Sequence, residues 1–551
     1  MKYSMLKDKY LWIVLISALV IRLYTGLTTF VITTDAVPYI DQAKNFIEGR
    51  FERLDYSQTT GLEYSYHPLY PFLTAVLYKC INSYEISAKI VSIIMGVSLV
   101  VAVYMFGKRI FDSRIAFLCG ILVAFHPYAA RLSAEILSES TYFFCFVLAI
   151  GLGYIAVNNF RPLYYVGTGV SSALAYLTRP EGVGVLFIVG FFTIFWKISG
   201  LKVSWSRRLW CLAVMLLAFS FLASPYIIYI KKQTGYWTLT KKKNLTELLG
   251  FENITQRAAS IADNTDEDKG KSEVINETIR AKPLRKIWDI DYKKCFNTLC
   301  FMISKFVSTY HPLLFLFMVV GLIKCKKIPG SGKPGVYLGL ILAFYLSILY
   351  ALTFVFSGED FYYLSRRHLM PLVIPTMFCS AIGVQTLCDW LPARLLRSGG
   401  EKKSAFQSIG NNKFLNLNLS IHVILPVVIL CLLLPKTLKF HRIERIGTKE
   451  AGYWLKDNAH NTPAVIMGIS PRIAYYAGGK HVYIDPGSYS EVITHARSSG
   501  VNYIEVYKEN IARICPDFFE SINSEDVELV YQHTYKGKSE DLNLLLYKVL
   551  Y

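Results

Sequence analysis

The sequence contains no C-x-x-C pair, and its 11 cysteines are scattered, most of them inside apolar runs. Cysteines in such runs usually act as small apolar side chains, so neither a zinc site nor a disulfide framework is expected. Acidic residues are scarce as well, with 40 Asp and Glu against 59 Lys and Arg. The sequence also lacks an internal repeat and the pair of broken apolar helices that is typical of many transporters.

Long apolar runs, in contrast, are abundant. Of the 551 residues, 53% are hydrophobic and 15% are aromatic, which excludes a water-soluble protein and predicts a mainly α-helical, multi-pass membrane bundle of about eleven spans. The first run is too long for a cleaved signal, so we expect it to be retained. The expected spans are residues 11–32, 86–106, 115–132, 140–157, 163–178, 182–198, 209–230, 297–323, 335–356, 368–388 and 419–436. The longest of them, 297–323, contains His311-Pro312 and is expected to break into an interfacial helix and a short span.

The net charge of +19 would suit nucleic-acid binding, but its distribution argues against that partner. Lys and Arg gather in alternate segments between the predicted spans, and the turns on the other side hold few of them. This asymmetry predicts a cytoplasmic N-terminus, an extracytoplasmic C-terminus and anionic membrane lipids as the partner of the charge. The basic segments are residues 1–10, 107–114, 158–162, 197–208, 324–333 and 389–413.

We predict two domains. Residues 1–440 form the transmembrane domain, with external loops at 33–85 and 231–296. From 441 to 551 the pattern changes to short alternating runs, which predict a soluble extracytoplasmic α/β domain without a catalytic motif, suited to a lid, docking or acceptor-recognition role. Its expected strands are 464–468, 481–485, 502–507, 527–534 and 543–549, and its expected helices are 450–458, 489–499 and 509–522.

An acidic residue, Asp35, follows the first apolar run at the predicted outer boundary of the membrane. Asp35, Tyr39 and Ala43 recur at intervals of four, so they lie on one face of a helix. A carboxylate at this boundary could accept a proton from an incoming hydroxyl. Alternatively, Asp35 caps the helix that begins near Pro38. The residues alone leave both interpretations open.

Four further segments carry polar groups at the predicted outer ends of spans. The aromatic stretch Tyr64-Ser65-Tyr66-His67-Pro68 places a histidine that could bind phosphate or simply precede a turn. Glu135 and Glu139 are expected to share a helical face, where they orient an acceptor, hold a cation, or cap the next span.

Arginines supply the opposite charge. Arg179 stands in the turn Leu177-Thr178-Arg179-Pro180-Glu181-Gly182 and could bind a lipid phosphate or pair with Glu181. Arg366 and Arg367 precede the tenth predicted span on the side that is otherwise poor in basic residues, so we expect an anionic partner for them. Together these groups suit a reaction on a lipid-linked phosphate.

At this point the sequence resembles the membrane glycosyltransferases of the C-type fold, in the branch of dolichyl-phosphate-mannose protein mannosyltransferases and bacterial aminoarabinose transferases for lipid A. The resemblance covers roughly residues 10–390 and extends to the tail. The motifs that carry it are Asp35-Ala36 with Tyr39, Ala43 and Gly49, His67-Pro68-Leu69-Tyr70-Pro71, Ser138-Glu139, Leu177–Gly182, Arg367–Leu372, and in the tail Trp454-Leu455-Lys456 and Ala474–Gly478. Three positions depart from the family pattern: Ala36 replaces the usual Glu, Leu69 a second Pro, and His368 a common Tyr.

The resemblance implies an inverting transfer of a sugar from a polyprenyl-monophosphate donor to a hydroxyl acceptor on a lipid, glycan or protein, at the outer face of the cell membrane. Asp35 would be the general base. The phosphate would be held by Arg367, Arg366, Arg179 and His67, and the acceptor or sugar positioned by Glu139, Glu135, Tyr39 and Tyr66. The phosphate is already a good leaving group, so no metal is obligatory; a divalent metal is compatible with the chemistry, although Ala36 weakens that case.

Three alternatives remain. A glycan ligase that uses a lipid-pyrophosphate donor would need similar external arginines but has less use for Asp35. A transporter or flippase of lipid-linked sugars predicts charged residues deep in the spans, where this sequence has few. A membrane scaffold with an exposed sensor domain accounts for the tail but leaves the external arginines unexplained.

Overall fold

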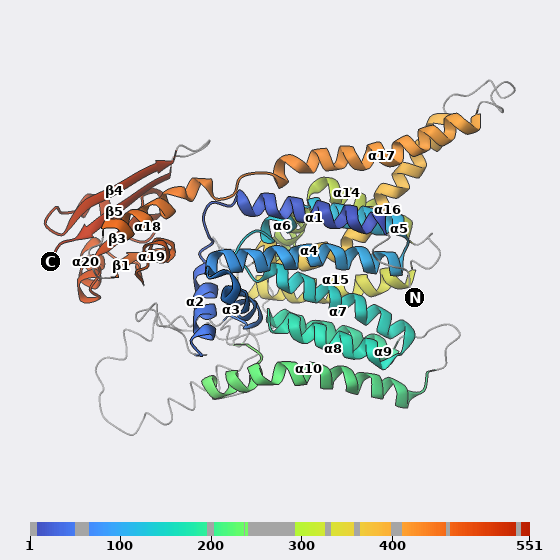
Figure 1. Ribbon diagram of the computed structural model, residues 1–551, viewed down its shortest axis with the longest axis horizontal. Helices are drawn as coiled ribbons and strands as arrows, with labels where there is room; N and C mark the ends of the chain where they lie inside the picture. Colours follow the sequence, from blue (N-terminus) through green and yellow to red (C-terminus); the bar gives the residue numbers. More distant parts are fainter. Residues whose placement is uncertain are drawn as a thin grey trace. The chain divides into compact units, whose positions relative to one another are not determined.

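The computed structural model describes residues 8–49, 66–195, 203–235, 237–240, 292–325, 332–356, 364–397, 410–458, 463–535 and 542–551 (Figure 1). Most of the predicted loop 231–296 and the part 50–65 of the first external loop, with Tyr64 and Ser65, therefore lie outside the described residues. The chain forms two compact units. The first consists of Met1–Met105, Gly120–Phe144 and Val423–Tyr551, and the second of Phe106–Cys119 and Cys145–His422.

Helices account for nearly all of the described residues before the tail. The first ten are α1 (Lys9–Leu27), α2 (Ala36–Ile47), α3 (Leu69–Ile81), α4 (Tyr84–Ile110), α5 (Ser113–Phe125), α6 (Pro127–Leu132), α7 (Glu139–Asn159), α8 (Pro162–Tyr176), α9 (Gly184–Phe195) and α10 (Trp205–Thr234), with the 3-10 helix η2 (Pro180–Val183) between α8 and α9. They are followed by α13 (Tyr292–Tyr310), α14 (Pro312–Cys325), α15 (Gly332–Phe356), α16 (Arg366–Arg397) and α17 (Gly410–Thr437).

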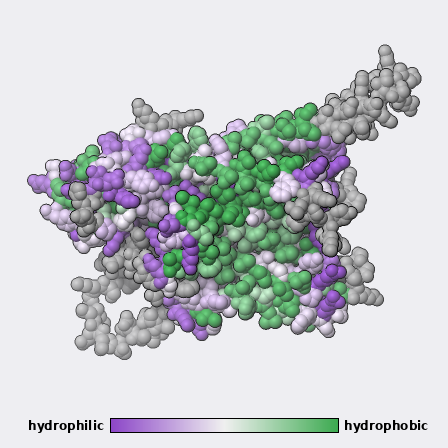
Figure 2. Space-filling model, viewed as in Figure 1, coloured by the Kyte–Doolittle hydropathy of each residue, from purple (hydrophilic) through white to green (hydrophobic). Residues whose placement is uncertain are grey.

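The chain is a multi-pass membrane protein. Within the described residues, six helices are long and apolar enough to cross a membrane, or up to seven if the bent pair α13 and α14 counts as one span. The predicted number of about eleven is not confirmed, because several predicted spans form shorter apolar helices such as Ser113–Phe125 and Ile421–Thr437. On the face shown in Figure 2, hydrophobic residues gather over the helices and hydrophilic residues over the C-terminal sheet domain.

Proline and its neighbours explain where the helices depart from the predicted spans. The predicted run 115–132 breaks at His126-Pro127, where the His126 side chain accepts a hydrogen bond from the Ala129 amide and begins α6. The predicted break at His311-Pro312 is confirmed, with a bend of 101° between α13 and α14. The first predicted span, 11–32, is wrong at its end: α1 stops at Leu27, and the chain reaches α2 through a non-helical segment.

Small residues and buried hydroxyls hold the second unit together. Gly321 of α14 and Gly383 of α16 each pack against the backbone of the other helix, so that a side chain at either position would collide with it. Nearby, the Tyr310 and Ser380 hydroxyls lie 2.9 Å apart and share a hydrogen bond. The close approach of the two helices at Gly321 and Gly383 explains why α14, although short, is held firmly against α16.

The five strands predicted in the tail are confirmed, and they form one sheet with the order β2-β1-β3-β5-β4. Strands β2, β1 and β3 are parallel, whereas β5 is antiparallel to both of its neighbours. The strands are β1 (Val465–Gly468), β2 (Lys480–Tyr483), β3 (Tyr503–Tyr507), β4 (Val527–Tyr535) and β5 (Leu542–Val549). The helices around them are α18 (Ile446–Asn458), α19 (Arg472–Ala477), α20 (Tyr489–Ser498), α21 (Lys508–Ile511) and α22 (Phe518–Ser521).

The two faces of the sheet carry separate cores, as the alternation of the strand residues requires. Met467 and Leu545 pack with α20 and α22, while their neighbours Ile466 and Leu546 pack with α18 and α19. The predicted helix 509–522 is wrong in its middle, because Pro516 separates α21 from α22. Helix α19 was not predicted. The domain boundary at residue 440 stays a prediction.

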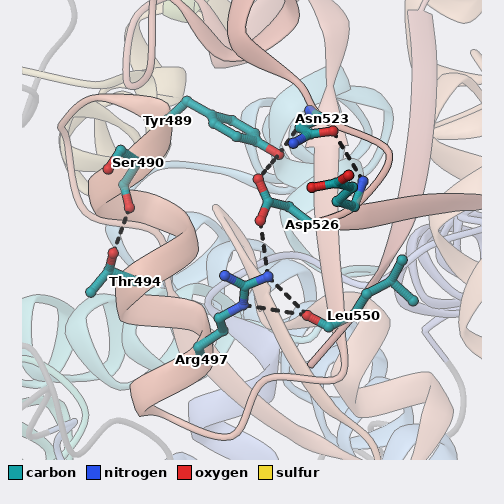
Figure 3. A network of polar contacts seen from close by, with 8 residues as sticks. Tyr489, Ser490, Thr494, Arg497, Asn523, Asp526 and Leu550 are labelled. Atoms are coloured by element: carbon teal, nitrogen blue, oxygen red, sulfur yellow. Dashed lines mark hydrogen bonds and ion pairs between the residues drawn. The ribbon is translucent and has the colours of Figure 1, made fainter.

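A surface network lies on the side of the sheet that α20 covers (Figure 3). The Arg497 guanidinium of α20 donates to the Asp526 carboxylate at 2.9 Å and to the Leu550 carbonyl at 3.1 Å. The Tyr489 hydroxyl reaches the other oxygen of Asp526 and accepts from the Asn523 amide. These contacts attach α20 to the end of the β4–β5 ribbon at which β4 begins and β5 ends. They are structural and lie apart from the residues that the sequence predicts to be functional.

Candidate active site

The predicted catalytic residue, Asp35, occupies the N-cap position of α2 and is half-buried. Its side chain makes no capping hydrogen bond to α2, so the alternative that Asp35 only caps this helix finds no support in the geometry. The helix predicted for Tyr39 and Ala43 is confirmed, and both side chains are fully buried or nearly so. Asp35 therefore lies at the more open end of a helix face that is otherwise packed.

Tyr39 lies at the centre of a group of aromatic and polar side chains, which we call the Tyr39 cluster: Tyr39, Tyr66, Tyr70, Ser138 and Glu139. The Tyr39 hydroxyl is 2.8 Å from the Ser138 hydroxyl. Its ring lies 4.3 Å from the Tyr66 ring and 5.2 Å from the Tyr70 ring, centroid to centroid. The cluster thus joins α2, α3 and the start of α7 within the first unit.

Glu139 begins α7 and is 1% exposed. Its charge lies within electrostatic reach of the Tyr70 hydroxyl, which in turn donates to the Ala88 carbonyl at 3.0 Å. His67 is also buried and lies between Tyr66 and Pro68, the N-cap residue of α3. The structure therefore brings Tyr39, Tyr66 and Glu139 together, with His67 next to Tyr66 along the chain.

Glu135 is placed differently from the prediction. Residues 133–138 are not helical, because α6 ends at Leu132 and α7 begins at Glu139, so Glu135 and Glu139 do not share a helical face. Glu135 is 3% exposed, and its Oε1 accepts from Arg131 Nε at 3.0 Å and from Arg442 at 3.2 Å. The two guanidinium groups compensate the buried charge, which makes Glu135 a structural joint between the α6–α7 bend and the segment after α17.

The predicted phosphate-binding arginines belong to the second unit. Arg179 precedes η2 and lies 3.5 Å from Glu181, so the alternative pairing with Glu181 is realised. Arg366 begins α16 and is exposed, whereas Arg367 is half-buried; the His368 ring accepts from the Ser365 amide at this helix start. The convergence of these arginines with Asp35 stays a prediction.

Sequence reasoning did not single out Arg22, which is 0% exposed in the middle of the apolar helix α1. Its Nη1 donates to the Ala18 and Ala124 carbonyls, both at 3.3 Å, while Nε and Nη2 have no hydrogen-bond partner in the described part of the chain. A charged residue inside an apolar span is the signal that could have identified it. Arg22 ties α1 to the end of α5 next to Ser133 and the α6–α7 bend.

No group of three or more His, Cys, Asp or Glu side chains that could hold a metal ion occurs among the residues that the structure describes. The metal requirement of the chemistry is not decided by this finding and stays a prediction.

Comparisons with known proteins agree with the predicted fold. Residues 65–229 of the 551 match the family model described as dolichyl-phosphate-mannose-protein mannosyltransferase. No curated protein sequence matches the chain. Among solved structures, ArnT from Cupriavidus metallidurans in the apo state is similar, with 13% identity, a TM-score of 0.54, and coverage of 98% of this chain and 97% of that chain.

Two further structures extend the comparison. ArnT from the same organism bound to undecaprenyl phosphate matches with 12% identity and a TM-score of 0.53, covering 97% of each chain. The archaeal oligosaccharyltransferase AglB from Archaeoglobus fulgidus, in complex with an inhibitory peptide and a dolichol-phosphate, matches with 13% identity and a TM-score of 0.53, covering 98% of this chain and 74% of that chain. Another structure of the Archaeoglobus protein is a complex with zinc and sulfate. These likenesses confirm the fold class that the sequence predicts.

Proposed function

We propose that this chain, a multi-pass membrane protein with the fold of the C-type glycosyltransferases, transfers a sugar from a polyprenyl-monophosphate donor to a hydroxyl acceptor. Relatives in fold bind undecaprenyl phosphate and dolichol-phosphate, which supports a lipid-phosphate donor. The partial match to the mannosyltransferase family model supports the same reaction class. The sugar and the acceptor are left open, and the reaction is proposed to take place at the outer face of the membrane.

The observation that carries the proposal is the arrangement around α2. A half-buried carboxylate, Asp35, stands one helical turn before Tyr39, whose hydroxyl is bonded to Ser138 beside the buried Glu139. An ionisable group at the open end of a packed aromatic cluster is the arrangement expected of a general base that meets its substrate. The packed part of the cluster would orient the acceptor or the donor sugar.

In the proposed reaction, Asp35 accepts the proton of the acceptor hydroxyl, and the hydroxyl oxygen forms a bond to the anomeric carbon. The bond from that carbon to the phosphate oxygen breaks, and the polyprenyl phosphate leaves with the electron pair. Attack from the face opposite to the phosphate inverts the anomeric configuration. Arg367 and Arg179, with His67, would stabilise the charge that develops on the phosphate, and Arg366 would add to this binding.

The second part of the proposal assigns the Tyr39 cluster to substrate positioning. Glu139, with Tyr39 and Tyr66, would hold the acceptor or the transferred sugar close to Asp35, because these side chains are fixed by packing and by hydrogen bonds. For Glu135 we propose a supporting part in the same site through the α6–α7 bend that it holds. No obligatory metal is needed for this chemistry, since a phosphate monoester is a good leaving group.

The test is to incubate the purified full-length protein, in lipid nanodiscs, with a panel of labelled polyprenyl-linked sugars and a mixed extract of lipids, glycans and proteins. We expect label to appear in an acceptor from a monophosphate donor. Label from pyrophosphate donors alone would support the glycan-ligase alternative instead. Movement of the labelled donor across a vesicle membrane without any transfer would support a flippase, and both outcomes would contradict the proposal.

A further inference from the structure

The segment that leads to Asp35 is held by the C-terminal part of the chain. Residues 28–35 connect α1 to α2. The Thr28 amide still donates to the Tyr24 carbonyl of α1, but the residues after it are not helical. Even so, Val31 is 0% and Ile32 2% exposed. A buried extended segment must find partners for its backbone amides elsewhere. Here the partners come from the residues after α17 and from the C-terminal sheet domain, all within the first unit.

The first contact is a short backbone pairing. The His441 amide donates to the Thr28 carbonyl at 3.1 Å, and the Phe30 amide donates to the His441 carbonyl at 3.2 Å. The Phe30 and Phe440 rings meet edge to face, with centroids 6.0 Å apart. The adjacent Arg442 is also the residue that binds Glu135. The residues that lead from α17 into the C-terminal domain are therefore paired with the segment that follows α1.

The second contact comes from α19. The Ile32 amide donates to the Tyr476 hydroxyl at 3.1 Å, and two residues later the Thr34 hydroxyl lies 3.4 Å from the Ser470 hydroxyl. Ser470 is itself fixed, because its oxygen accepts from Arg472 Nε at 2.9 Å. The last of these contacts is made by Thr34, the residue directly before Asp35.

Tyr476 is well placed to act as a fixed support. It is 5% exposed, and its ring packs against the Tyr453 and Tyr475 rings at 5.7 and 5.3 Å. Gly452 of α18 packs directly against the Tyr476 Cβ, where any side chain would collide. Residues of α18 and α19 pack in the core of the sheet domain, so the Tyr476 side chain is held by that core.

We propose that the C-terminal domain positions the general base: Tyr476, by accepting the Ile32 N–H, fixes the 28–35 segment and so places the Asp35 carboxylate for proton transfer. This inference rests on the proposed function. Tyr476 is a positioning residue that acts through the backbone. The domain is therefore part of the catalytic arrangement, which goes beyond the docking or lid role that the sequence suggests for it.

The experiment compares Tyr476→Phe with the wild-type full-length protein. The variant keeps the ring packing and removes only the acceptor of the Ile32 amide. We expect kcat to fall about tenfold or more with the KM for the donor unchanged, because a small misplacement of a catalytic group slows the chemical step. We also expect faster hydrogen exchange of the amides in residues 28–35. Tyr475→Phe is the matched control, since its hydroxyl makes no hydrogen bond within the described residues, and should change neither quantity.

The outcomes separate the two proposals. If the wild-type protein transfers sugar from no donor, the proposed function fails, while the exchange measurement still reports the contact. If exchange in residues 28–35 is unchanged in Tyr476→Phe, or if it rises while kcat stays at the wild-type value, the positioning role is wrong. A loss confined to KM also overturns it. Should Tyr476→Phe fold poorly, Thr34→Val removes the neighbouring contact from an exposed side chain, and the same pattern with a smaller fall in kcat is expected.

Discussion

The surroundings of Asp35 and of Glu135 differ, although both carboxylates lie in the first unit and the sequence proposes both for the site. Glu135 is 3% exposed and held by two guanidinium groups within 3.3 Å. Asp35 is half-buried at the N-cap of α2, where its side chain does not cap the helix. The charge of Glu135 is used to join two parts of the fold, whereas Asp35 stands at the open end of a packed face.

The difference separates a carboxylate that stabilises the fold, Glu135, from one that is proposed to react, Asp35. A buried carboxylate with two arginine partners is costly to disturb and has little capacity left for a substrate. A partly exposed carboxylate next to an aromatic cluster can meet a substrate directly. We therefore expect replacement of Asp35 to change activity and not stability. Replacement of Glu135 should lower stability, and any loss of activity should follow from the weakened α6–α7 bend.

The largest effect is expected for Asp35→Asn. The amide keeps the shape of the side chain but cannot accept a proton, so sugar transfer should fall by about 10²–10⁴-fold, the usual contribution of general base catalysis. Thermal unfolding should remain unchanged. The control is Asp41→Asn on the same helix, where Asp41 pairs with Lys44 at 3.0 Å. Comparable activity of the two variants would remove Asp35 from the catalytic role.

The second prediction concerns Glu135→Gln. Removing the charge leaves Arg131 and Arg442 facing each other across the α6–α7 bend, so we expect a loss of about 3 kcal/mol in the free energy of unfolding. Glu85→Gln, which breaks the more exposed helical pair with Lys89, should cost less than about 1 kcal/mol. Unfolding midpoints of the solubilised proteins measure both. Wild-type stability in Glu135→Gln, combined with lost transfer, would reverse the comparison with Asp35.

A third carboxylate, Glu505 of β3, extends the comparison because it is as buried as Glu135, but neither of its oxygens makes a hydrogen bond to any residue that the structure describes. Burial raises the pKa of Glu505 to about 7, although the Arg472 and Arg445 charges counteract this. The folded state then holds the proton more tightly than the unfolded chain, whose pKa is near 4.5. Its contribution to stability is therefore complete below the unfolded pKa and is lost as the pH rises through about 7.

For the wild-type protein relative to Glu505→Gln, we expect stability to fall by about 2 kcal/mol between pH 5 and pH 7. Unfolding midpoints of the two proteins, measured side by side across this range, provide the test. Parallel pH profiles of the two proteins would mean that Glu505 has an ionised partner in the folded state, as Glu135 has. The measurement thus tests whether burial or the nearby arginines determine the protonation state of Glu505.

The fold was largely predictable, because its signals are local. Apolar runs identified the membrane helices, alternation identified all five strands, and His311-Pro312 identified the bend between α13 and α14. Two errors have local causes, because Pro127 and Pro516 break predicted helices. The third does not: the first span ends at Leu27, and the residues that follow it pair with His441. That pairing joins positions more than 400 residues apart, and no sequence pattern reveals it.

The site was predictable only in part, since residue type does not disclose the partner of a charge. Asp35, Tyr39 and Glu139 could be selected from spacing and from position at helix ends. The neutralisation of Glu135 could not, because Arg442 approaches it from the far end of the chain. The contact between Tyr476 and the Ile32 amide was unpredictable for the same reason, because a tyrosine in a short unpredicted helix carries no signal of its own.

The smallest effect is expected for Arg367→Ala, which extends the comparison to the cations of the second unit. Arg179 already faces Glu181 at 3.5 Å, whereas Arg367 is half-buried at the start of α16 on the side where the sequence predicts few basic residues. If Arg367 binds the donor phosphate, its loss removes one charged hydrogen bond, worth about tenfold in the KM for the donor, and leaves the KM for the acceptor unchanged. Arg114→Ala, an exposed arginine at the start of α5, should change neither. Equal shifts of both KM values would show that Arg367 acts through the fold and not on the donor. The proposed site would then lack Arg367 as a phosphate contact.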